Sequence, residues 1–232
     1  MRNKVSLIVV AAITVVLFVT ASVRCVLKSV PTMAQATGLQ TIIIDPGHGG
    51  FDGGAESPDG IEEKNINLEV SLRLRDILKS FGFNVVMTRE TDCSTEDSGN
   101  KIRSKKRSDI HNRLELFQED PRAIVVSIHQ NKFSQSKYWG TQVFYGVKQE
   151  ETSKQLAETI QKNVVKGLQP ENTREVKKGY KTIYLLQHTP NVMVMVECGF
   201  VSNPEELTRL CNPDYQTQMA FIIAASIMEF ST

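Results

Sequence analysis

Four side chains in this sequence have the chemical types needed for metal-assisted hydrolysis. His48, His129 and Glu197 each stand at the end of a short apolar run or just after one. Glu63 stands where a long amphipathic stretch begins, just after a glycine-rich segment. The four residues are far apart in the sequence, so only a fold that gathers these points at one edge would make a site of them.

Two histidines and one carboxylate around Zn²⁺, with water in the fourth position, form a recurring catalytic set. A zinc ion lowers the pKa of its bound water and polarises a carbonyl, so an amide can be attacked near neutral pH. A second carboxylate could take the proton from that water and pass it to the leaving nitrogen. The residue types therefore predict a nucleophile, an electrophile and a proton shuttle for amide hydrolysis.

The elements expected to position these residues alternate between strand and helix. Short β-branched runs predict strands at 41–45, 83–88, 123–128, 141–145 and 192–196. Apolar residues at helical spacing predict helices at 66–81, 108–117, 152–168 and 214–230. This order predicts a single α/β domain with a mostly parallel, mixed and twisted sheet covered by helices on both faces. Ligands of such sheets bind beyond the carboxyl ends of the strands, where we expect the four side chains to meet.

Each candidate also has a simpler explanation. His48 could be a loop residue held by backbone groups, and His129 could cap its strand. Glu63, or Glu62 beside it, could favour a helix N-terminus through the helix dipole. Glu197 is harder to explain in this way, because a carboxylate directly after five apolar residues is costly to bury without a partner.

The remaining histidines and the cysteines are predicted to have structural roles. His111 lies within a charged helical stretch and His188 in a loop, so neither is expected to bind the metal. The four cysteines have no C-x-x-C spacing, so neither a zinc finger nor a disulfide framework is expected, although a Cys198–Cys211 bond stays open. Apolar neighbours disfavour Cys198 as a nucleophile. The nucleophile motif G-x-S-x-G and the phosphate-binding motif G-x-x-x-x-G-K are both absent.

The charge balance excludes a nucleic-acid-binding surface. The 232 residues include 27 Lys plus Arg against 26 Asp plus Glu, a formal net charge of +1. Such a balance lacks the basic footprint of proteins that bind nucleic acid. The one basic cluster, 103–107, falls at the end of the polar stretch 93–106, which predicts a solvated loop.

The N-terminal residues predict export. An uncharged, mostly apolar run from Val5 to Val23 follows Arg2 and Lys4, and its length is close to the roughly 20 residues that span a bilayer. We interpret 1–24 as an uncleaved signal anchor, 25–40 as a linker and 41–232 as the catalytic domain. Cleaved export is the alternative. Both place the domain outside the cytoplasm.

Four motifs together resemble a known family, the zinc-dependent N-acetylmuramoyl-L-alanine amidases. The motifs are Asp45-Pro46-Gly47-His48-Gly49-Gly50, Glu63-Lys64 with Asn67-Leu68, Ser127-Ile128-His129-Gln130-Asn131, and Glu197-Cys198-Gly199-Phe200-Val201-Ser202-Asn203. The resemblance implies that His48, Glu63 and His129 bind one Zn²⁺ and that Glu197 is the catalytic carboxylate. It also implies that the substrate is the amide between N-acetylmuramic acid and L-alanine in peptidoglycan. Gln130 and Cys198 depart from the usual residues of the family, without touching the proposed chemistry.

Within that family, a single domain behind an N-terminal anchor is similar to the sporulation amidases of spore-forming bacteria. Those enzymes remove whole stem peptides from cortex peptidoglycan, which prepares muramic-δ-lactam formation and later germination. Some family members carry an inhibitory helix between the His129 strand and the next strand. Here 132–139 is too short for a substantial helix. We therefore expect an open groove, with any control exerted by a separate activator protein or by the timing of sporulation.

Two other functions remain compatible with the residues. A zinc peptidase that cuts within the stem peptide would use the same site chemistry. A non-catalytic wall-binding module could keep the fold, although recognition alone does not require a proton shuttle at Glu197. The products released from peptidoglycan would separate these possibilities.

Overall fold

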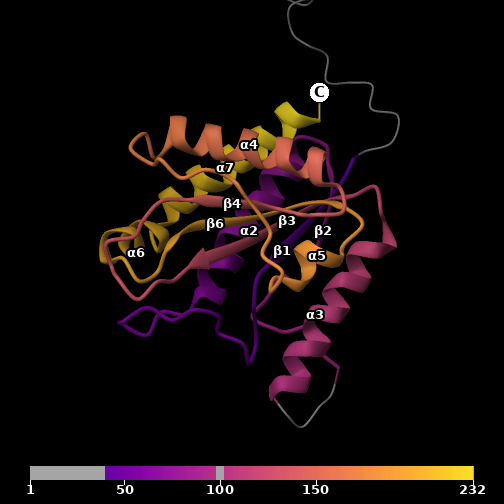
Figure 1. The fold of residues 1–232 in the computed structure, drawn as a ribbon, viewed down its shortest axis with the longest axis horizontal. Helices are drawn as coiled ribbons and strands as arrows, with labels where there is room; N and C mark the ends of the chain where they lie inside the picture. Colours follow the sequence, from indigo (N-terminus) through magenta and orange to yellow (C-terminus); the bar gives the residue numbers. More distant parts are fainter. Residues whose placement is uncertain (1–39, 98–101, 232) are drawn as a thin grey trace, which may run out of the picture. The chain divides into compact units, whose positions relative to one another are not determined.

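A six-stranded mixed sheet forms the centre of the domain in the computed structural model, which describes residues 40–97 and 102–231 (Figure 1). Its strand order is β2-β1-β3-β6-β4-β5. The strands are β1 (Thr41–Pro46), β2 (Asn84–Met87), β3 (Ile124–Asn131), β4 (Gln142–Tyr145), β5 (Lys177–Lys178) and β6 (Val192–Phe200). The helices are α2 (Glu63–Ser80), α3 (Ile102–Glu119), α4 (Glu150–Gly167), α5 (Tyr184–His188), α6 (Pro204–Leu210) and α7 (Pro213–Phe230).

The sheet is mostly parallel, as predicted. Strands β2, β1, β3 and β6 run parallel to one another, whereas β4 pairs antiparallel with β6 and carries β5 at the edge. The carboxyl ends of β1, β3 and β6 therefore lie together. In the register of the sheet, Asp45 pairs with Ser127 and His129 pairs with Glu197.

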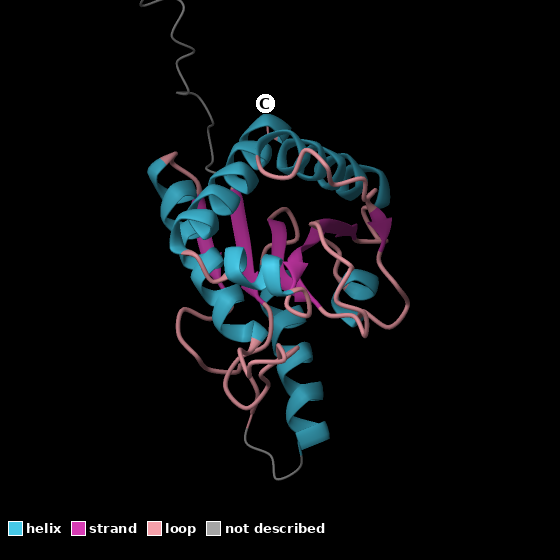
Figure 2. Ribbon diagram, turned by 90° about the vertical axis from the view of Figure 1, so that its left-hand side faces the viewer, coloured by secondary structure: helices cyan, strands magenta, loops and turns pink. Residues whose placement is uncertain are grey.

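Alternate residues of each strand point to opposite faces of the sheet, and each face has its own core. Ile42 and Ile44 pack in the larger core with α2, α4 and α7. Ile43 packs in the smaller core with α3 and α5. Figure 2 shows helices on both sides of the strands. The predicted α/β fold with two covered faces is confirmed.

The same alternation determines where the candidate residues lie. Asp45 follows Ile43 by two positions, and Glu197 follows Met195 by two positions, so both belong to the face covered by α3 and α5. His129 shares this face with Val125. Helix α5, which has only five residues, lines a pocket on this face together with the three side chains.

Several predicted boundaries were wrong. Helix α3 begins at Ile102 rather than at 108, so the basic cluster 103–107 is helical and not a solvated loop. Lys and Arg are good helix formers, but these exposed residues lack the apolar spacing used to detect helices. Strands β3 and β6 continue past His129 and Glu197.

Three short elements, β5, α5 and α6, were missed. Helix α6 had a readable signal, because the Asn203 side chain accepts hydrogen bonds from the backbone of Glu205 and Glu206 while Pro204 opens the first turn.

The segment between β3 and β4 contains no helix, in agreement with the prediction for 132–139. Cys93, Cys198 and Cys211 are free thiols, so the Cys198–Cys211 bond that the sequence left open is not formed. The predicted anchor 1–24, and the linker apart from Gln40, lie outside the described residues. Within the described ranges, no helix has the length and apolar character needed to cross a bilayer.

Candidate metal centre

The loop after β1 presents His48 in an unusual backbone conformation. His48 has a φ of 62°, and no other non-glycine residue in the described part of the chain has a positive φ. Gly49 and Gly50, which follow it, also have positive φ values. A side chain in this left-handed region costs on the order of 1 kcal/mol or more and persists only where surrounding contacts hold it. The loop is therefore built to aim the His48 ring.

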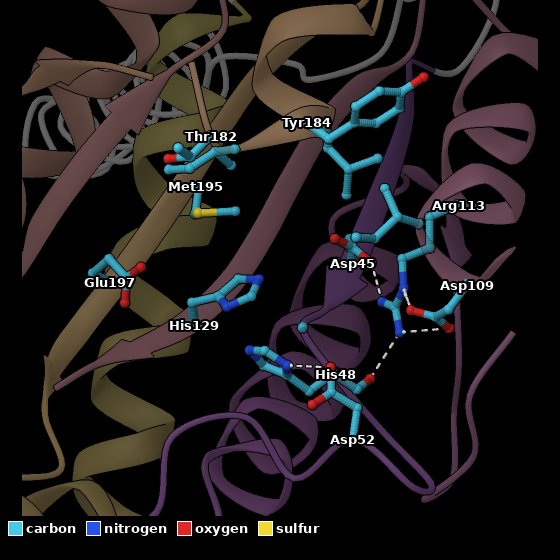
Figure 3. Close-up of a pocket in the computed structure, with 14 residues that line it drawn as sticks. Asp45, His48, Asp52, Asp109, Arg113, His129, Thr182, Tyr184, Met195 and Glu197 are labelled. Carbon is cyan, nitrogen blue, oxygen red and sulfur yellow. Dashed lines mark hydrogen bonds and ion pairs between the residues drawn. The ribbon is translucent and has the colours of Figure 1, made fainter. Parts of the chain in front are cut away.

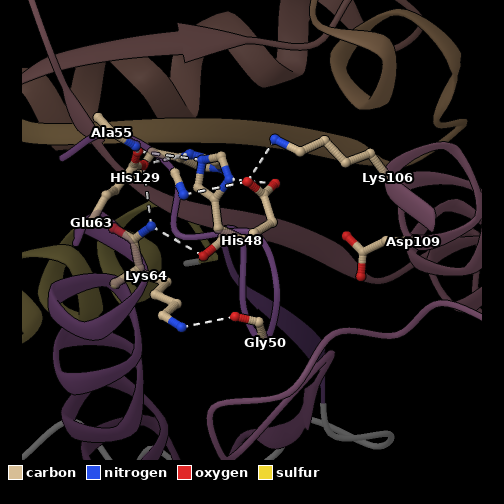
Figure 4. A network of polar contacts seen from close by, with 12 residues as sticks. His48, Gly50, Ala55, Glu63, Lys64, Lys106, Asp109 and His129 are labelled. Atoms are coloured by element: carbon tan, nitrogen blue, oxygen red, sulfur yellow. Dashed lines mark hydrogen bonds and ion pairs between the residues drawn. The ribbon is translucent and has the colours of Figure 1, made fainter. Parts of the chain in front are cut away.

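Glu63 joins the two candidate histidines. One of its carboxylate oxygens lies 3.0 Å from His129 Nδ1, and the other lies 3.3 Å from His48 Nε2 (Figure 4). The backbone N–H groups of Ala55 and Gln130 donate to the same two oxygens, at 2.7 and 2.9 Å, and fix the carboxylate between the rings. The ligand atoms of His48, Glu63 and His129 lie within 4.8 Å of one another. The three residues thus form one cluster that could hold a metal ion.

Glu62, the alternative to Glu63, lies outside this cluster. Its side chain is 41% exposed and pairs with Lys64 Nζ at 3.3 Å, whereas the Glu63 side chain is 4% exposed. The backbone turn that begins α2 therefore points only Glu63 toward the histidines. His111 and His188 are also outside the cluster and lie near Tyr184 on the face of α3 and α5.

Asp52 supports His48 from the side away from Glu63. Its carboxylate lies 2.9 Å from His48 Nδ1 and 2.7 Å from Lys106 Nζ. A carboxylate on the second ring nitrogen fixes the orientation of a metal-binding histidine and makes it a stronger ligand. Sequence reasoning missed Asp52, although its place four residues after His48 in the glycine-rich loop was a usable signal.

Two buried arginines hold the loop that carries His48. Arg113 of α3 donates to the carbonyl oxygens of His48, at 2.7 Å, and Pro46, at 3.0 Å. Arg89, just after β2, donates to the carbonyls of Pro46 and Gly47, both at 3.0 Å. Asp45 and Asp109 neutralise Arg113 in this buried position (Figure 3). Neither arginine was predicted from the sequence, because nothing local marks a side chain that contacts a loop more than 40 residues away.

Glu197 lies beside the cluster with one unsatisfied oxygen. Its Oε2 atom is inaccessible to solvent and has no hydrogen-bond partner among the described residues. Burial, reinforced by the negative charge of Glu63 and opposed by His129, raises the pKa of Glu197 to about 7. A carboxyl group with that pKa can both accept and donate a proton near neutral pH. Burial also raises the pKa of the Cys198 thiol, which agrees with its exclusion as a nucleophile.

A pocket of about 300 Å³ brings these groups to the surface (Figure 3). His48, His129 and Glu197 lie along one part of its lining, and Asp52 lies next to His48. Ile183, Leu185 and Met195 add apolar surface to the same lining. The pocket can therefore admit a substrate with a polar bond at the cluster and an apolar portion against these side chains.

The metal-free cluster should make stability depend on pH. Burial favours neutral His48, but hydrogen bonds from its ring to Asp52 and Glu63 outweigh this effect and raise the pKa from 6.5 to about 9. The folded chain therefore binds this proton more tightly than the unfolded chain does. The resulting stabilisation is complete below pH 6.5 and is lost as the pH rises through 9. The loss should reach at most about 3 kcal/mol.

Urea unfolding in the presence of a chelator at pH 6.5, 7.5 and 9 would measure this effect. His48→Asn is the matched variant, since asparagine tolerates the left-handed backbone but does not titrate. The raised pKa of Glu197 changes the free energy of unfolding mainly between pH 4.5 and 7, which is below most of the pH range measured. An equal pH dependence in His48→Asn would show that another group is responsible.

Comparisons with known proteins show which family this chain is similar to. A family model described as N-acetylmuramoyl-L-alanine amidase matches residues 42–229. The germination-specific N-acetylmuramoyl-L-alanine amidase of Bacillus subtilis (strain 168) is 38% identical over 192 residues, which cover 82% of this chain and 79% of that protein. A structure of the CwlD amidase from Clostridioides difficile in complex with the GerS lipoprotein is 39% identical, with a TM-score of 0.79 over 83% of this chain and 98% of that one. The amidase AmiC2 of Nostoc punctiforme is 28% identical, with a TM-score of 0.69 over 84% of this chain and 98% of that one.

Proposed function

The chain belongs to the N-acetylmuramoyl-L-alanine amidase family, and we propose that it is a zinc enzyme that removes stem peptides from spore-cortex peptidoglycan. The observation that carries the proposal is the juxtaposition of two histidines and one carboxylate with the unpaired oxygen of Glu197. Membership of the family indicates which bond is cut, and the site contains the groups that could hydrolyse it.

The donor set fits zinc. Imidazole nitrogens and a carboxylate oxygen are common Zn²⁺ ligands, and three of them leave room for water or substrate. His48, Glu63 and His129 would hold the ion. When bound, it lowers the pKa of water and polarises the carbonyl of the muramoyl amide.

Glu197 supplies the proton transfers of the reaction. Its carboxylate accepts a proton as water adds to the lactyl carbonyl, and it returns that proton to the nitrogen of L-alanine as the C–N bond breaks. The products are a lactyl carboxylate on the sugar and a free amine on the stem. Asp52 and Arg113 keep the His48 ring and its loop in place through the reaction.

Assignment to the cortex rests on the germination-specific relative and on the products. Removing the whole stem exposes the lactyl carboxyl group of muramic acid, which is the group needed for muramic-δ-lactam formation. The enzyme would act outside the cytoplasm, tethered by 1–24 through the linker 25–40, with 41–232 as the catalytic domain. Membrane fractionation of spore-forming cells would test the tether.

A separate protein would control the enzyme. No helix lies between β3 and β4 to cover the pocket. The related Clostridioides difficile amidase was solved in complex with a lipoprotein. We expect a partner of that kind to raise the activity of this chain, which a comparison of rates with and without the lipoprotein of the same organism would measure.

Replacing Gly47 by alanine should displace His129 and weaken metal binding. A Cβ atom at Gly47 would lie 2.3 Å from both His129 Nε2 and Cε1, which is too close for either group to stay in place. Because a misplacement of about 1 Å in a catalytic site can cost roughly 100-fold in rate, we expect a loss of that order. Gly146→Ala is the control, since its nearest contact would be an ordinary 3.4 Å to Met193. Zinc affinity and rate should both be measured, and retention of both in Gly47→Ala would contradict the placement of His129.

Digestion of purified peptidoglycan would test the function. The full chain, loaded with zinc, should release intact stem peptides that begin with L-alanine, as identified by mass spectrometry. Shortened stems would instead identify a peptidase. Failure to release any product from vegetative or cortex wall, even with sporulating-cell extract and bound zinc, would favour a wall-binding module.

A further inference from the structure

A second hollow lies next to the catalytic pocket, on the surface formed by α3 and α5. Lys106, Arg107, Ile110, His111 and Tyr184 line it. Ile110 and Tyr184 also line the pocket that contains His48 and Glu197, so the two hollows share a wall. Figure 3 shows Tyr184, one of the two shared residues, at the pocket that contains Glu197, His129 and His48.

The charge of this second hollow is positive. It contains two cationic side chains and no acidic one. Lys106 is already paired with Asp52 at 2.7 Å (Figure 4). Arg107 is exposed, and no hydrogen bond or ion pair of its guanidinium is found among the described residues. Arg107 is therefore the cation that remains available to a ligand.

The two halves of the proposed substrate differ in charge. The lactyl carboxyl of muramic acid is consumed in the amide that is cut, so an unmodified glycan strand is uncharged. The stem peptide carries free carboxylates on its acidic residues and at its C-terminus. An extended peptide advances roughly 3.3 Å per residue, so carboxylates a few residues from the cut bond can reach beyond the pocket wall.

We propose that the hollow beside α3 and α5 is the subsite for the stem peptide, and that Arg107 pairs with a stem carboxylate there. This inference rests on the proposed function and adds the direction in which the substrate lies. The stem runs from Glu197 past Ile110 and Tyr184 to Arg107, and the glycan lies on the other side of the cut bond. Arg107 then sets specificity and takes no part in the chemistry.

Kinetics with two matched substrates would test the proposal. A soluble muramoyl peptide with free stem carboxylates is compared with the same peptide carrying carboxamides. For the free carboxylates, Arg107→Gln should raise KM roughly three- to tenfold and leave kcat unchanged, and Arg107→Glu should raise it further. For the carboxamides, wild type and Arg107→Gln should be alike. Arg122→Gln, which removes a 95% exposed cation elsewhere, is the charge control.

Binding measurements separate this proposal from the proposed function. The affinity of each uncleaved substrate is measured by calorimetry on Glu197→Gln, with and without Arg107→Gln. A carboxylate-dependent loss of affinity supports the subsite even if turnover fails. Equal effects of Arg107→Gln on both substrates, or none on either, overturn the subsite. A zinc-loaded wild type that releases no stem, even with sporulating-cell extract, counts against the amidase function and leaves the binding result for the subsite unaffected.

Discussion

Replacing Glu197 by glutamine should reduce stem release by roughly 10²- to 10⁴-fold without removing the metal. Glutamine has nearly the same shape as glutamate but cannot accept the proton of the attacking water. The geometry supports a role in chemistry and not in structure, because the Oε2 atom makes no hydrogen bond within the described residues. Replacing this oxygen therefore removes no hydrogen bond that holds the pocket together.

The matched control for this variant is Glu205→Gln, an exposed glutamate in the first turn of α6. Both chains are assayed for kcat on a soluble muramoyl peptide and for zinc content on the same sample. Full zinc with an activity loss only in Glu197→Gln supports the assignment. Loss of zinc along with activity would make Glu197 part of the metal centre. A residual rate above a tenth of wild type would require a different base.

Glu63→Gln should remove metal binding, whereas Glu62→Gln should not. Changing the partners of metal ligands typically costs 10- to 100-fold in affinity, so loss of a ligand should cost roughly 100-fold or more. The neighbouring glutamates have the same chemistry and nearly the same place in sequence. They differ in environment, since Glu63 touches both histidines and Glu62 pairs with Lys64 near the surface.

Competition with a chelator of known affinity would measure zinc binding by the two variants. Thermal unfolding with and without zinc gives a second readout, because a ligand that binds only the folded chain raises its stability. Wild type and Glu62→Gln should gain a similar increase in Tm from zinc, and Glu63→Gln little or none. The opposite pattern would transfer the ligand role to Glu62 and refute the metal centre described here.

The sequence predicted the sheet and the proximity of the candidate site residues for a common physical reason. Strands buried on both faces are short, β-branched runs that stand out in a sequence, and parallel strands place their carboxyl ends at one edge. Once the runs before His129 and Glu197 were assigned as strands, the meeting of those two side chains followed from topology. The assignment of Glu63 over Glu62 needed the resemblance to a family, because both glutamates stand at the same helix start.

The residues that support the site were not predictable in this way. The Arg89 side chain contacts the backbone just before His48, and the Arg113 side chain contacts the carbonyl of His48 itself. Both arginines come from distant parts of the chain. Such contacts leave no periodic pattern, and a buried arginine looks like a surface one in sequence. The start of α3 was missed for a related reason, since its first residues are polar and mostly exposed. The positions of the two arginines and the start of α3 depend on tertiary contacts, which leave no local pattern in the sequence.

The bond from Arg113 to the carbonyl of His48 also links α3 to the metal centre energetically. Any transient opening that lifts α3 from the sheet must release the strained His48 backbone. A ligand that requires the ordered His48 therefore raises the free energy of that opening. Amide hydrogens along α3 should then exchange more slowly in the zinc-bound chain than in the metal-free chain. Arg107 lies on the same helix. Metal binding would therefore also reduce the transient opening of the surface proposed to bind the stem peptide.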